Sequence, residues 1–399
     1  MVATPCFFAH RSAKDPGRIQ GTQHQVLRTG QAADGRLELR QSTGKDRDTC
    51  APVRHSEGMH ADPLDRALDQ LHATDFEYAS ENLDGLSNHG PMAAEALVAL
   101  GRPERVEPFV AAYMPRLRPL RPAARALAER YERAVGEGDW RAPLREALDE
   151  LLPGAVAAGA HGWIRTGHAV RALATRDTPA RRRELAFALA SWSARAERLP
   201  GQPGARPEPG LDVVRALARV PIVAPVDRKR GGLITEQAEV VQGFTGFADA
   251  VEAVDLAAQP FSEAVSALAA AAARLYLATP AERFVYLHAV TATSALRIVG
   301  DALDEERKRR ALGAVFQVVA ALHATHADPG TAPRGLEEPF APDLDLRQLE
   351  RSPATLAARA AESDDDHDVK LTEAALREHA RSPRDEFVAA AAVRLGLFA

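Results

Sequence analysis

Apolar residues recur about every 3.6 positions through most of the chain after residue 58. The pattern is clear in Arg121–Val135, Arg141–Leu152, Arg181–Leu199, Phe261–Ala278 and Leu303–His323. That spacing places apolar side chains on one face of an α-helix, whereas a half-buried strand would alternate apolar and polar residues. The sequence contains no convincing alternating run and no strict repeat. It therefore predicts an all-α fold: a single, multi-helix, bundle-like domain.

The composition agrees with close-packed helices. Hydrophobic residues make up 46% of the 399 residues but aromatic residues only 5%, so alanine, leucine and valine must fill most of the core. Both cysteines, Cys6 and Cys50, precede residue 59, which excludes a disulfide framework and a thiolate metal site in the main body. The net charge of −5 gives no reason to expect a nucleic-acid partner.

Residues 1–58 differ from the remainder of the chain. They are polar and lack apolar periodicity, which predicts a disordered tail or an upstream extension that ends before Met59. We expect residues 59–399 to form the helical domain. The sequence has no uninterrupted run of 18 apolar residues and no signal-peptide core, so we expect a cytoplasmic protein without a membrane partner.

The sequence motifs that are typical of several enzyme classes are absent from this chain. The chain has no GxGxxG after a strand, no GxxxxGK followed by serine or threonine, no GxSxG and no HExxH. Dinucleotide-binding, ATP-binding, hydrolase and zinc-protease interpretations therefore have no motif to support them.

Two histidines stand in apolar surroundings on separate segments. His89 precedes a helix that Pro91 opens and that Ser87 or Asn88 can cap. His288 lies at the centre of one of the most apolar helices in the chain. Each is either a hydrogen-bonded structural residue or a ligand, and the residues alone leave both interpretations open.

His161 and His168 are seven residues apart, which puts both on one helix face, with Arg165 on the same stripe. Burying these side chains without partners would be costly, so the stripe is either functional or exposed to solvent. Gly162 and Gly167 each weaken a helix by roughly 1 kcal/mol. Their presence predicts close approach by another helix or by a ligand.

His367 and Lys370 share a face at the start of a helix that Asp364, Asp365 and Asp366 can cap. A solvent-facing Asp/Lys pair would explain them simply. However, the chain has 45 arginines and five lysines, so a position needing only a cation would more often hold arginine. Lysine, unlike arginine, can lose its proton, form a Schiff base or take up CO2 as a carbamate.

Other polar residues fit structural roles. We expect His72 and His379 to lie on helix surfaces and Arg181–Arg183 to form a solvated face. His323 and His326 end a helix, where a histidine suits the negative end of the helix dipole.

Histidines from at least four helices, together with a carbamate-type oxygen, form a ligand set that suits iron, zinc or manganese. Four segments in this order resemble the questin oxidase-like family: Ser87–Met92, His161–His168, Leu287–Thr291 and Asp366–Leu371. The similarity runs from about Asp62 to the C-terminus.

This resemblance implies an all-α oxygenase that opens a ring of an anthraquinone-type aromatic polyketide with O2, in some descriptions with NADPH as the reductant. It also implies a non-heme iron(II) held by four histidines and a carboxylated lysine. Carried over to this sequence, these are His89, His161, His288, His367 and Lys370. Fungal members tend to have a second histidine where this chain has Arg165, so the choice between His161 and His168 stays open.

Three functions therefore compete. In the first, a non-heme iron oxygenase, Arg165 and His168 orient the substrate oxygens or assist proton transfer. The second is a metal-free, NADPH-dependent oxidoreductase of the Baeyer–Villiger type. The third is a non-catalytic helical binding protein.

Overall fold

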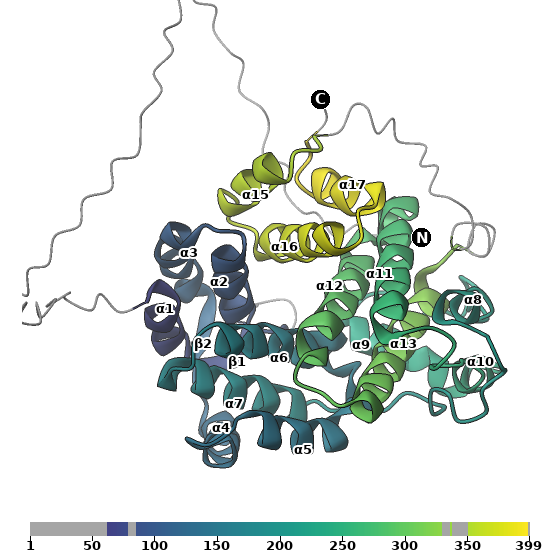
Figure 1. Ribbon diagram of the computed structural model, residues 1–399, viewed down its shortest axis with the longest axis horizontal. Coiled ribbons are helices and arrows are strands. Elements are labelled where there is room, and N and C mark those ends of the chain that lie inside the picture. Colours follow the sequence, from purple (N-terminus) through teal and green to yellow (C-terminus); the bar gives the residue numbers. More distant parts are fainter. Residues whose placement is uncertain (1–61, 79–84, 329–335, 337–349, 398–399) are drawn as a thin grey trace, which may run out of the picture. The chain divides into compact units, whose positions relative to one another are not determined.

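The computed structural model describes residues 62–78, 85–328, 336 and 350–397. The tail expected over residues 1–58 lies outside these ranges. Contacts group Met59–Ala399 into one unit. The described part of this unit is mostly helical, which confirms the predicted all-α fold class (Figure 1).

The helices and strands have the following bounds. The first half contains α1 (Pro63–Leu71), β1 (Thr74–Tyr78), α2 (Gly90–Ala99), α3 (Val106–Tyr113), β2 (Leu117–Pro119), α4 (Pro122–Val135), α5 (Arg141–Leu151), α6 (Ala157–Thr175) and α7 (Pro179–Ser193). The second half contains α8 (Val213–Ala218), α9 (Ile234–Ala238), α10 (Phe247–Glu252), α11 (Phe261–Ala278), α12 (Arg283–Gly300), α13 (Glu305–His326), α15 (Pro353–Ala361), α16 (Asp366–Arg381) and α17 (Asp385–Arg394).

Helix boundaries test the periodicity directly. The helix predicted over Phe261–Ala278 has those bounds in the structure. The helix predicted to reach Leu199 instead ends at Ser193. Glu197 forms an isolated β-bridge with Ala155, and this pairing replaces continued helix. Residues 194–199 have apolar residues at helical spacing, which extended the prediction to Leu199, but they do not form a helix.

A short antiparallel sheet is the main departure from the predicted secondary structure. Strands β1 and β2 pair with Thr74 opposite Pro119 and Tyr78 opposite Leu117. A five-residue strand is too short for its period to stand out, and its partner lies about 40 residues away. Glu77 on β1 also forms an isolated antiparallel β-bridge with Ser87, which lies just before α2.

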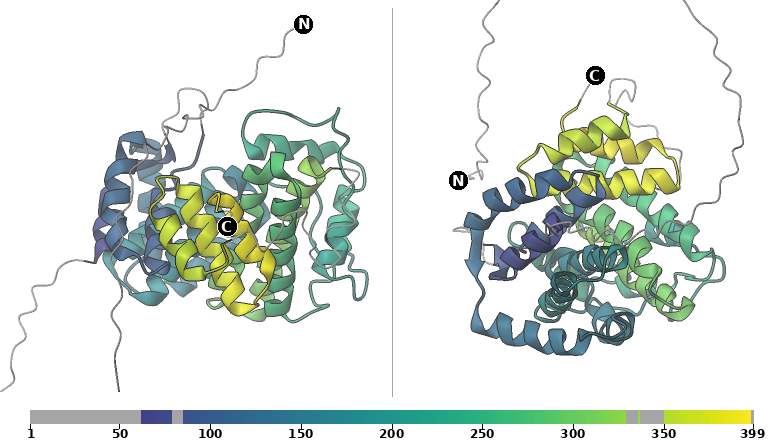
Figure 2. Two further views of the ribbon diagram at one scale, coloured as in Figure 1. Left: turned by 90° about the horizontal axis from the view of Figure 1, so that it is seen from above. Right: turned by 60° about the vertical axis from the view of Figure 1, so that its left-hand side comes forward.

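Four helices from distant parts of the sequence form a closed ring of contacts. Helix α2 packs on α6, α6 on α12, α12 on α16, and α16 on α2. Figure 1 shows α16 alongside α12, and the second view of Figure 2 shows the C-terminal helices lying over the earlier ones. The N-terminal ends of these four helices carry the site described below.

Two glycines allow close contact between helices around α6. A Cβ on Gly162 would lie 2.5 Å from the Trp192 Cβ on α7, and one on Gly167 would lie 2.9 Å from the Ala295 Cβ on α12. The predicted close approach is therefore confirmed, and other helices make it.

Small aliphatic side chains fill the core, as the composition predicted. Most of the buried hydrophobic residues are alanine, leucine or valine. Among the described residues, α11 is long and apolar enough to cross a membrane by length and composition, but 61% of that segment is buried in the fold. Core helices of soluble proteins meet the same criteria.

Candidate metal centre

His89 is held at the start of α2. It is the N-cap residue, and the preceding Asn88 caps the turn because its Oδ1 accepts from the Gly90 N–H at 3.0 Å. The backbone N–H of His89 donates to the Tyr113 hydroxyl at 3.0 Å. Its ring Nδ1 contacts Asp366 Oδ1 at 2.6 Å. The backbone of His89 is therefore fixed by α3 and its ring by α16.

His161 follows an unusual turn at the start of α6. Ala158, Gly159 and Ala160 all have positive φ angles, of 50°, 69° and 68°. For the two alanines this conformation costs on the order of 1–2 kcal/mol each. The regular helix begins only at His161, whose Nδ1 donates to the Ala158 carbonyl. The strained turn thus places this histidine at a helix N-terminus.

The other two histidines also lie near helix starts. His288 is in the second turn of α12, where its Nδ1 donates to the Phe284 carbonyl at 2.9 Å. His367 is the second residue of α16, and its backbone N–H donates to the capping Asp365 at 2.9 Å. The His367 Nδ1 lies 3.2 Å from Asp365 and 3.1 Å from Asp366.

The four rings contact one another. Ring centroids are 4.4 Å apart for His89 and His161, 4.7 Å for His89 and His367, 4.8 Å for His161 and His288, and 5.9 Å for His288 and His367. The structure thus brings together all four histidines that the family resemblance selected. His161, rather than His168, is the member of this cluster on α6.

The ring nitrogens have the pattern of metal ligands. In each ring Nδ1 faces a carbonyl or carboxylate acceptor, which fixes the tautomer that leaves Nε2 with a lone pair. The Nε2 atoms of His161, His288 and His367 are buried without a hydrogen-bond partner. One ring nitrogen each from His89, His161 and His367 lies within 4.8 Å of the others. This buried group can hold a metal ion.

Burial keeps the rings of His89, His161 and His288 in the neutral form that binds metals. Burial, followed by the Lys370 ammonium group, lowers the pKa of His89 to about 3. Burial also lowers the pKa of His161 and of His288 well below the usual value, and in both cases the next cause is another histidine of the cluster. An uncharged imidazole offers its lone pair at any physiological pH.

Asp366 is a central residue that the sequence analysis missed. Its Oδ1 lies 3.3 Å from the Lys370 ammonium, in addition to its contacts with His89 and His367. Burial alone would raise the pKa of Asp366, but the neighbouring His89 and Lys370 lower it well below its usual value. The three consecutive aspartates were all predicted to cap the helix; only Asp365 does so, while Asp366 is buried in the cluster.

Lys370 is a buried lysine. Only 3% of its surface is exposed, so the interpretation as a solvent-facing Asp/Lys pair is wrong, although the pair itself exists. Burial lowers the pKa of Lys370, and Asp366 opposes this change. A half-exposed phenylalanine, Phe284, which sequence reasoning also missed, contacts the rings of His288 and His367 at 5.5 and 5.2 Å.

His168 lies in a buried ionic network. Its Nδ1 is 2.7 Å from Glu95 Oε2, and Glu95 also accepts from Arg171, which pairs with Glu373. This network joins α2, α6 and α16, three of the helices that carry the clustered histidines. Burial lowers the pKa of His168, against the opposing effect of Glu95. The structure thus gives His168 a bridging position, and its proposed catalytic role stays a prediction.

Arg165 is also bound to a carboxylate. Its Nε and Nη2 donate to the two oxygens of Glu184 at 2.6 and 2.9 Å, and His72 contacts the same carboxylate at 3.0 Å. His72 is therefore buried, and its predicted surface position is wrong. Arg181, predicted to be solvated, is buried against Asp62 and Asp65.

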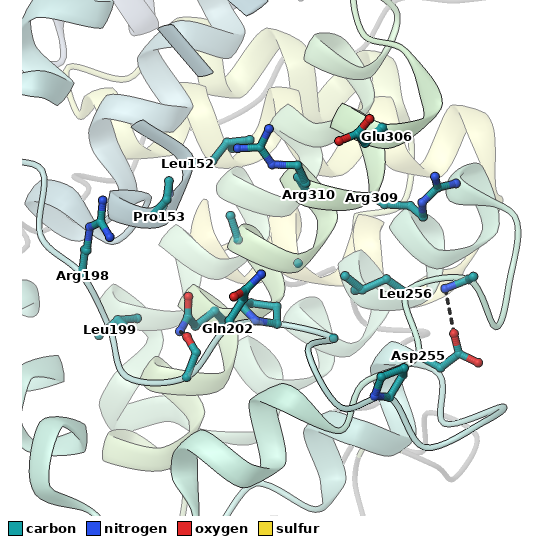
Figure 3. Close-up of a pocket in the computed structure, with 18 residues that line it drawn as sticks. Leu152, Pro153, Arg198, Leu199, Gln202, Asp255, Leu256, Glu306, Arg309 and Arg310 are labelled. Atoms are coloured by element: carbon teal, nitrogen blue, oxygen red, sulfur yellow. Dashed lines mark hydrogen bonds between the residues drawn. The ribbon is translucent and has the colours of Figure 1, made fainter. Parts of the chain in front are cut away.

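A cavity of about 650 Å³ lies apart from the histidines and is lined by loop residues after α7 and by α13. Figure 3 shows Arg198 on one side of this groove and Arg309 and Arg310 on the other. None of the predicted site residues lines it.

No protein-family model matches the chain, and no curated protein matches it. The similarity to the questin oxidase-like family therefore stays a prediction.

Proposed function

We propose that this protein is a non-heme iron oxygenase whose metal is held by the four-histidine cluster. The observation that supports this most is the set of buried Nε2 atoms without partners, in rings whose Nδ1 atoms face acceptors. An unsatisfied buried polar atom costs about 1–3 kcal/mol, so three in one cluster need a ligand to compensate. Imidazoles suit iron, copper, nickel and zinc, and the choice of iron comes from the family resemblance.

The ligands we propose are His89, His161, His288 and His367, with one oxygen donor. An ammonium group cannot bind a metal, and we propose that Lys370 contributes as a carbamate. The carbamate forms when the neutral Nζ attacks CO2: one N–C bond forms, one C–O π bond of CO2 breaks, and the nitrogen releases one proton. The carbamate would be a second anion beside Asp366, and the metal cation would compensate this charge. Asp366 itself is the alternative oxygen donor.

Bound iron would supply the activation of O2. The protein residues would exclude water and hold the imidazoles in one tautomer. The N-terminal parts of four helices carry the histidines, and their positive ends would favour negative charge in this region. The substrate class we propose is an anthraquinone-type aromatic polyketide, whose ring C–C bond is cleaved oxidatively. If both oxygen atoms enter the product, no further reductant is required; if one leaves as water, NADPH supplies two electrons.

Metal analysis of the purified protein tests this proposal. We expect near one iron per chain in the wild type and a loss of at least ten-fold in metal affinity in His288→Ala, because one ligand is removed. His379→Ala is the matched control, since His379 lies near the other end of α16, where its Nδ1 donates to the Arg384 carbonyl. A wild-type protein without transition metal contradicts the proposal. Tight NADPH binding by that metal-free protein would instead favour the Baeyer–Villiger alternative. A protein that binds neither metal nor NADPH would favour the third alternative, a non-catalytic binding protein.

The carbamate on Lys370 has a test of its own. Protein loaded with zinc, a diamagnetic substitute for iron(II), and incubated with carbon-13-labelled bicarbonate is expected to give a carbamate resonance in its NMR spectrum. The resonance should disappear in Lys370→Arg and after metal removal, because the uncompensated anion beside Asp366 would favour loss of CO2. A metal-loaded wild type without this resonance would leave Asp366 as the oxygen donor.

A further inference from the structure

A pocket rich in arginines lies apart from the histidine cluster. It measures about 230 Å³, and residues of α5, α6, α12 and α16 form its walls. Trp140, Val170 and Ile298 are among the apolar residues that line it, and none of the four clustered histidines does so. The charged residues that line it are Arg141, Arg171, Arg297, Arg377, Arg381 and Asp301. Five guanidinium groups from four helices therefore surround one small space.

Buried glutamates hold the inner arginines of this pocket in fixed positions. Arg171 donates to both oxygens of Glu95, at 2.7 Å from Nε and 2.5 Å from Nη2, and it also pairs with Glu373. Arg377 donates from Nε to Glu373 at 3.0 Å. Both glutamates are buried. A ligand would therefore meet guanidinium groups that are already ordered, which reduces the entropic cost of binding.

Arg297 and Arg381 retain donors that no described residue uses. Nε and Nη2 of Arg297 bind the buried Glu378 at 3.1 and 2.8 Å, but its Nη1 has no partner in the described part of the chain and is open to solvent. Arg381 is the last residue of α16 and is exposed. Its guanidinium makes no hydrogen bond or ion pair with another described residue. These donors are available to the oxygens of a ligand.

The charges around the pocket favour an anion. Five arginines and one aspartate line it, and three buried glutamates lie behind the arginines, so five positive charges against four negative ones leave one positive charge. Arg145 adds another beside the wall, where its Nε donates to the Ala302 carbonyl. Asp139 lies 3.5 Å from Arg141, but both side chains are exposed, so solvent screens this pair.

We propose that this pocket binds a small phosphate-type anion, either free phosphate or a phosphate monoester. The two oxygens of a carboxylate lie in one plane, and a single guanidinium can bind both. A tetrahedral phosphate presents oxygens in several directions and can engage arginines from different sides, as the helices place them here. Binding at this site is independent of any reaction at the histidine cluster.

Calorimetric titration of the full chain with sodium phosphate, at constant ionic strength and neutral pH, tests this proposal. We expect one phosphate per chain with a Kd below about 1 mM. Acetate, which is planar and has one charge, should bind at least ten-fold more weakly, and equal affinities would overturn the assignment to phosphate. Glycerol 3-phosphate distinguishes the two sources: binding tighter than that of phosphate supports an ester, and weaker binding supports the free ion.

A failure to saturate would also overturn the proposal. If neither phosphate nor glycerol 3-phosphate saturates the protein by about 10 mM, the arginines have a structural role. They would then neutralise the buried glutamates and interact with the C-terminal ends of α6, α12 and α16.

A change at the rim assigns the binding to this pocket. Arg381→Gln removes a charge without breaking an ion pair between described residues, so the variant should fold. Its affinity for phosphate should fall about ten-fold, the effect of losing a hydrogen bond from a charged group. Arg309→Gln makes the same change at an exposed arginine in the other cavity and should leave the affinity unchanged. Equal affinities in these two variants would mean that phosphate binds elsewhere, for example at the metal centre.

A second pair of variants separates charge from space. Ala174 is exposed and lines the pocket, so substitutions there should fold. Ala174→Glu places a carboxylate among the arginines and should weaken phosphate binding by about 100-fold, because like charges repel and the new carboxylate occupies the same donors. Ala174→Gln adds a side chain of similar size without the charge and should cost less than about ten-fold. Equal affinities in Ala174→Glu and Ala174→Gln would overturn the proposed anion site.

Discussion

Asp366 connects three of the groups around which the candidate centre is built. A single carboxylate contacts the His89 ring, the His367 ring and the Lys370 ammonium. Such a carboxylate orients a ligating imidazole and increases its basicity, and residues in this position affect metal affinity nearly as much as the ligands do. Neighbouring acids in the same run have different roles: Asp365 caps α16, and Asp364 is exposed.

Asp366→Asn is therefore expected to reduce metal affinity by about 10- to 100-fold, as for other partners of ligating histidines. The free energy of unfolding of the metal-free protein should also fall, because the Lys370 ammonium loses its buried counter-charge. Competition with a chelator measures the affinity, and urea titration measures the stability. Asp364→Asn removes the same charge from an exposed position two residues away and should change neither. Equal affinities in the two variants would show that Asp366 does not support the centre.

Helix α6 sets the geometry of the site at the level of secondary structure. Its sequence placed His161 and His168 on one continuous face, but the left-handed turn makes His161 the first residue of the regular helix. His161 therefore joins the cluster, while His168, two turns later, joins α6 to α2 through Glu95. Glycines on the same helix let its two neighbours pack closely.

Gly162→Ala tests this packing. The added Cβ would meet both the Cβ and the Cγ of Trp192 at 2.5 Å, so α6 and α7 must separate. We expect the free energy of unfolding to fall by about 1–3 kcal/mol, the usual cost of overpacking a core. A Cβ on Gly138 meets no atom within 4 Å, so Gly138→Ala should lie within about 0.5 kcal/mol of wild type. Urea unfolding of the two variants measures both values, and equal stabilities would contradict close packing at Gly162.

Across the whole molecule, buried histidines create a dependence of stability on pH. Burial lowers the pKa of His323 to about 4 and, as the largest cause, also lowers the pKa of His326 to about 4. Burial also lowers the pKa of His89, His161 and His288. Each is neutral in the folded protein but takes up a proton in the unfolded chain below about pH 6.5, so stability rises with pH through this window.

Metal-free protein is therefore expected to lose stability as the pH falls from about 6.5 toward 4, by up to roughly 1.4 kcal/mol per pH unit for each such histidine. His323→Leu removes one of these groups. The free energy of unfolding of this variant should therefore fall over that pH range by about 3 kcal/mol less than that of the wild type. Urea unfolding of both proteins at several pH values measures the difference. Parallel curves would mean that His323 titrates normally in the folded state.

Local features of the fold could be predicted from the sequence because they depend on neighbouring residues. Helical periodicity, proline at helix starts and the small-residue core are all readable within a few turns. The close helix contacts at Gly162 and Gly167 were predictable for the same reason, although their partners were not. The two-stranded sheet and the early end of α7 were missed because each depends on a residue brought from elsewhere in the chain.

The candidate site needed more than local pattern. Residue types alone marked His89, His161, His288 and His367 without choosing ligands over structural roles, and the family resemblance made that choice. Tertiary structure decided that their rings meet, that Asp366 joins them, and that Arg165 and His168 pair with acids on other helices. Periodicity fixes the face of a helix on which a side chain lies, whereas the meeting of four helix ends is fixed by packing between segments nearly 280 residues apart.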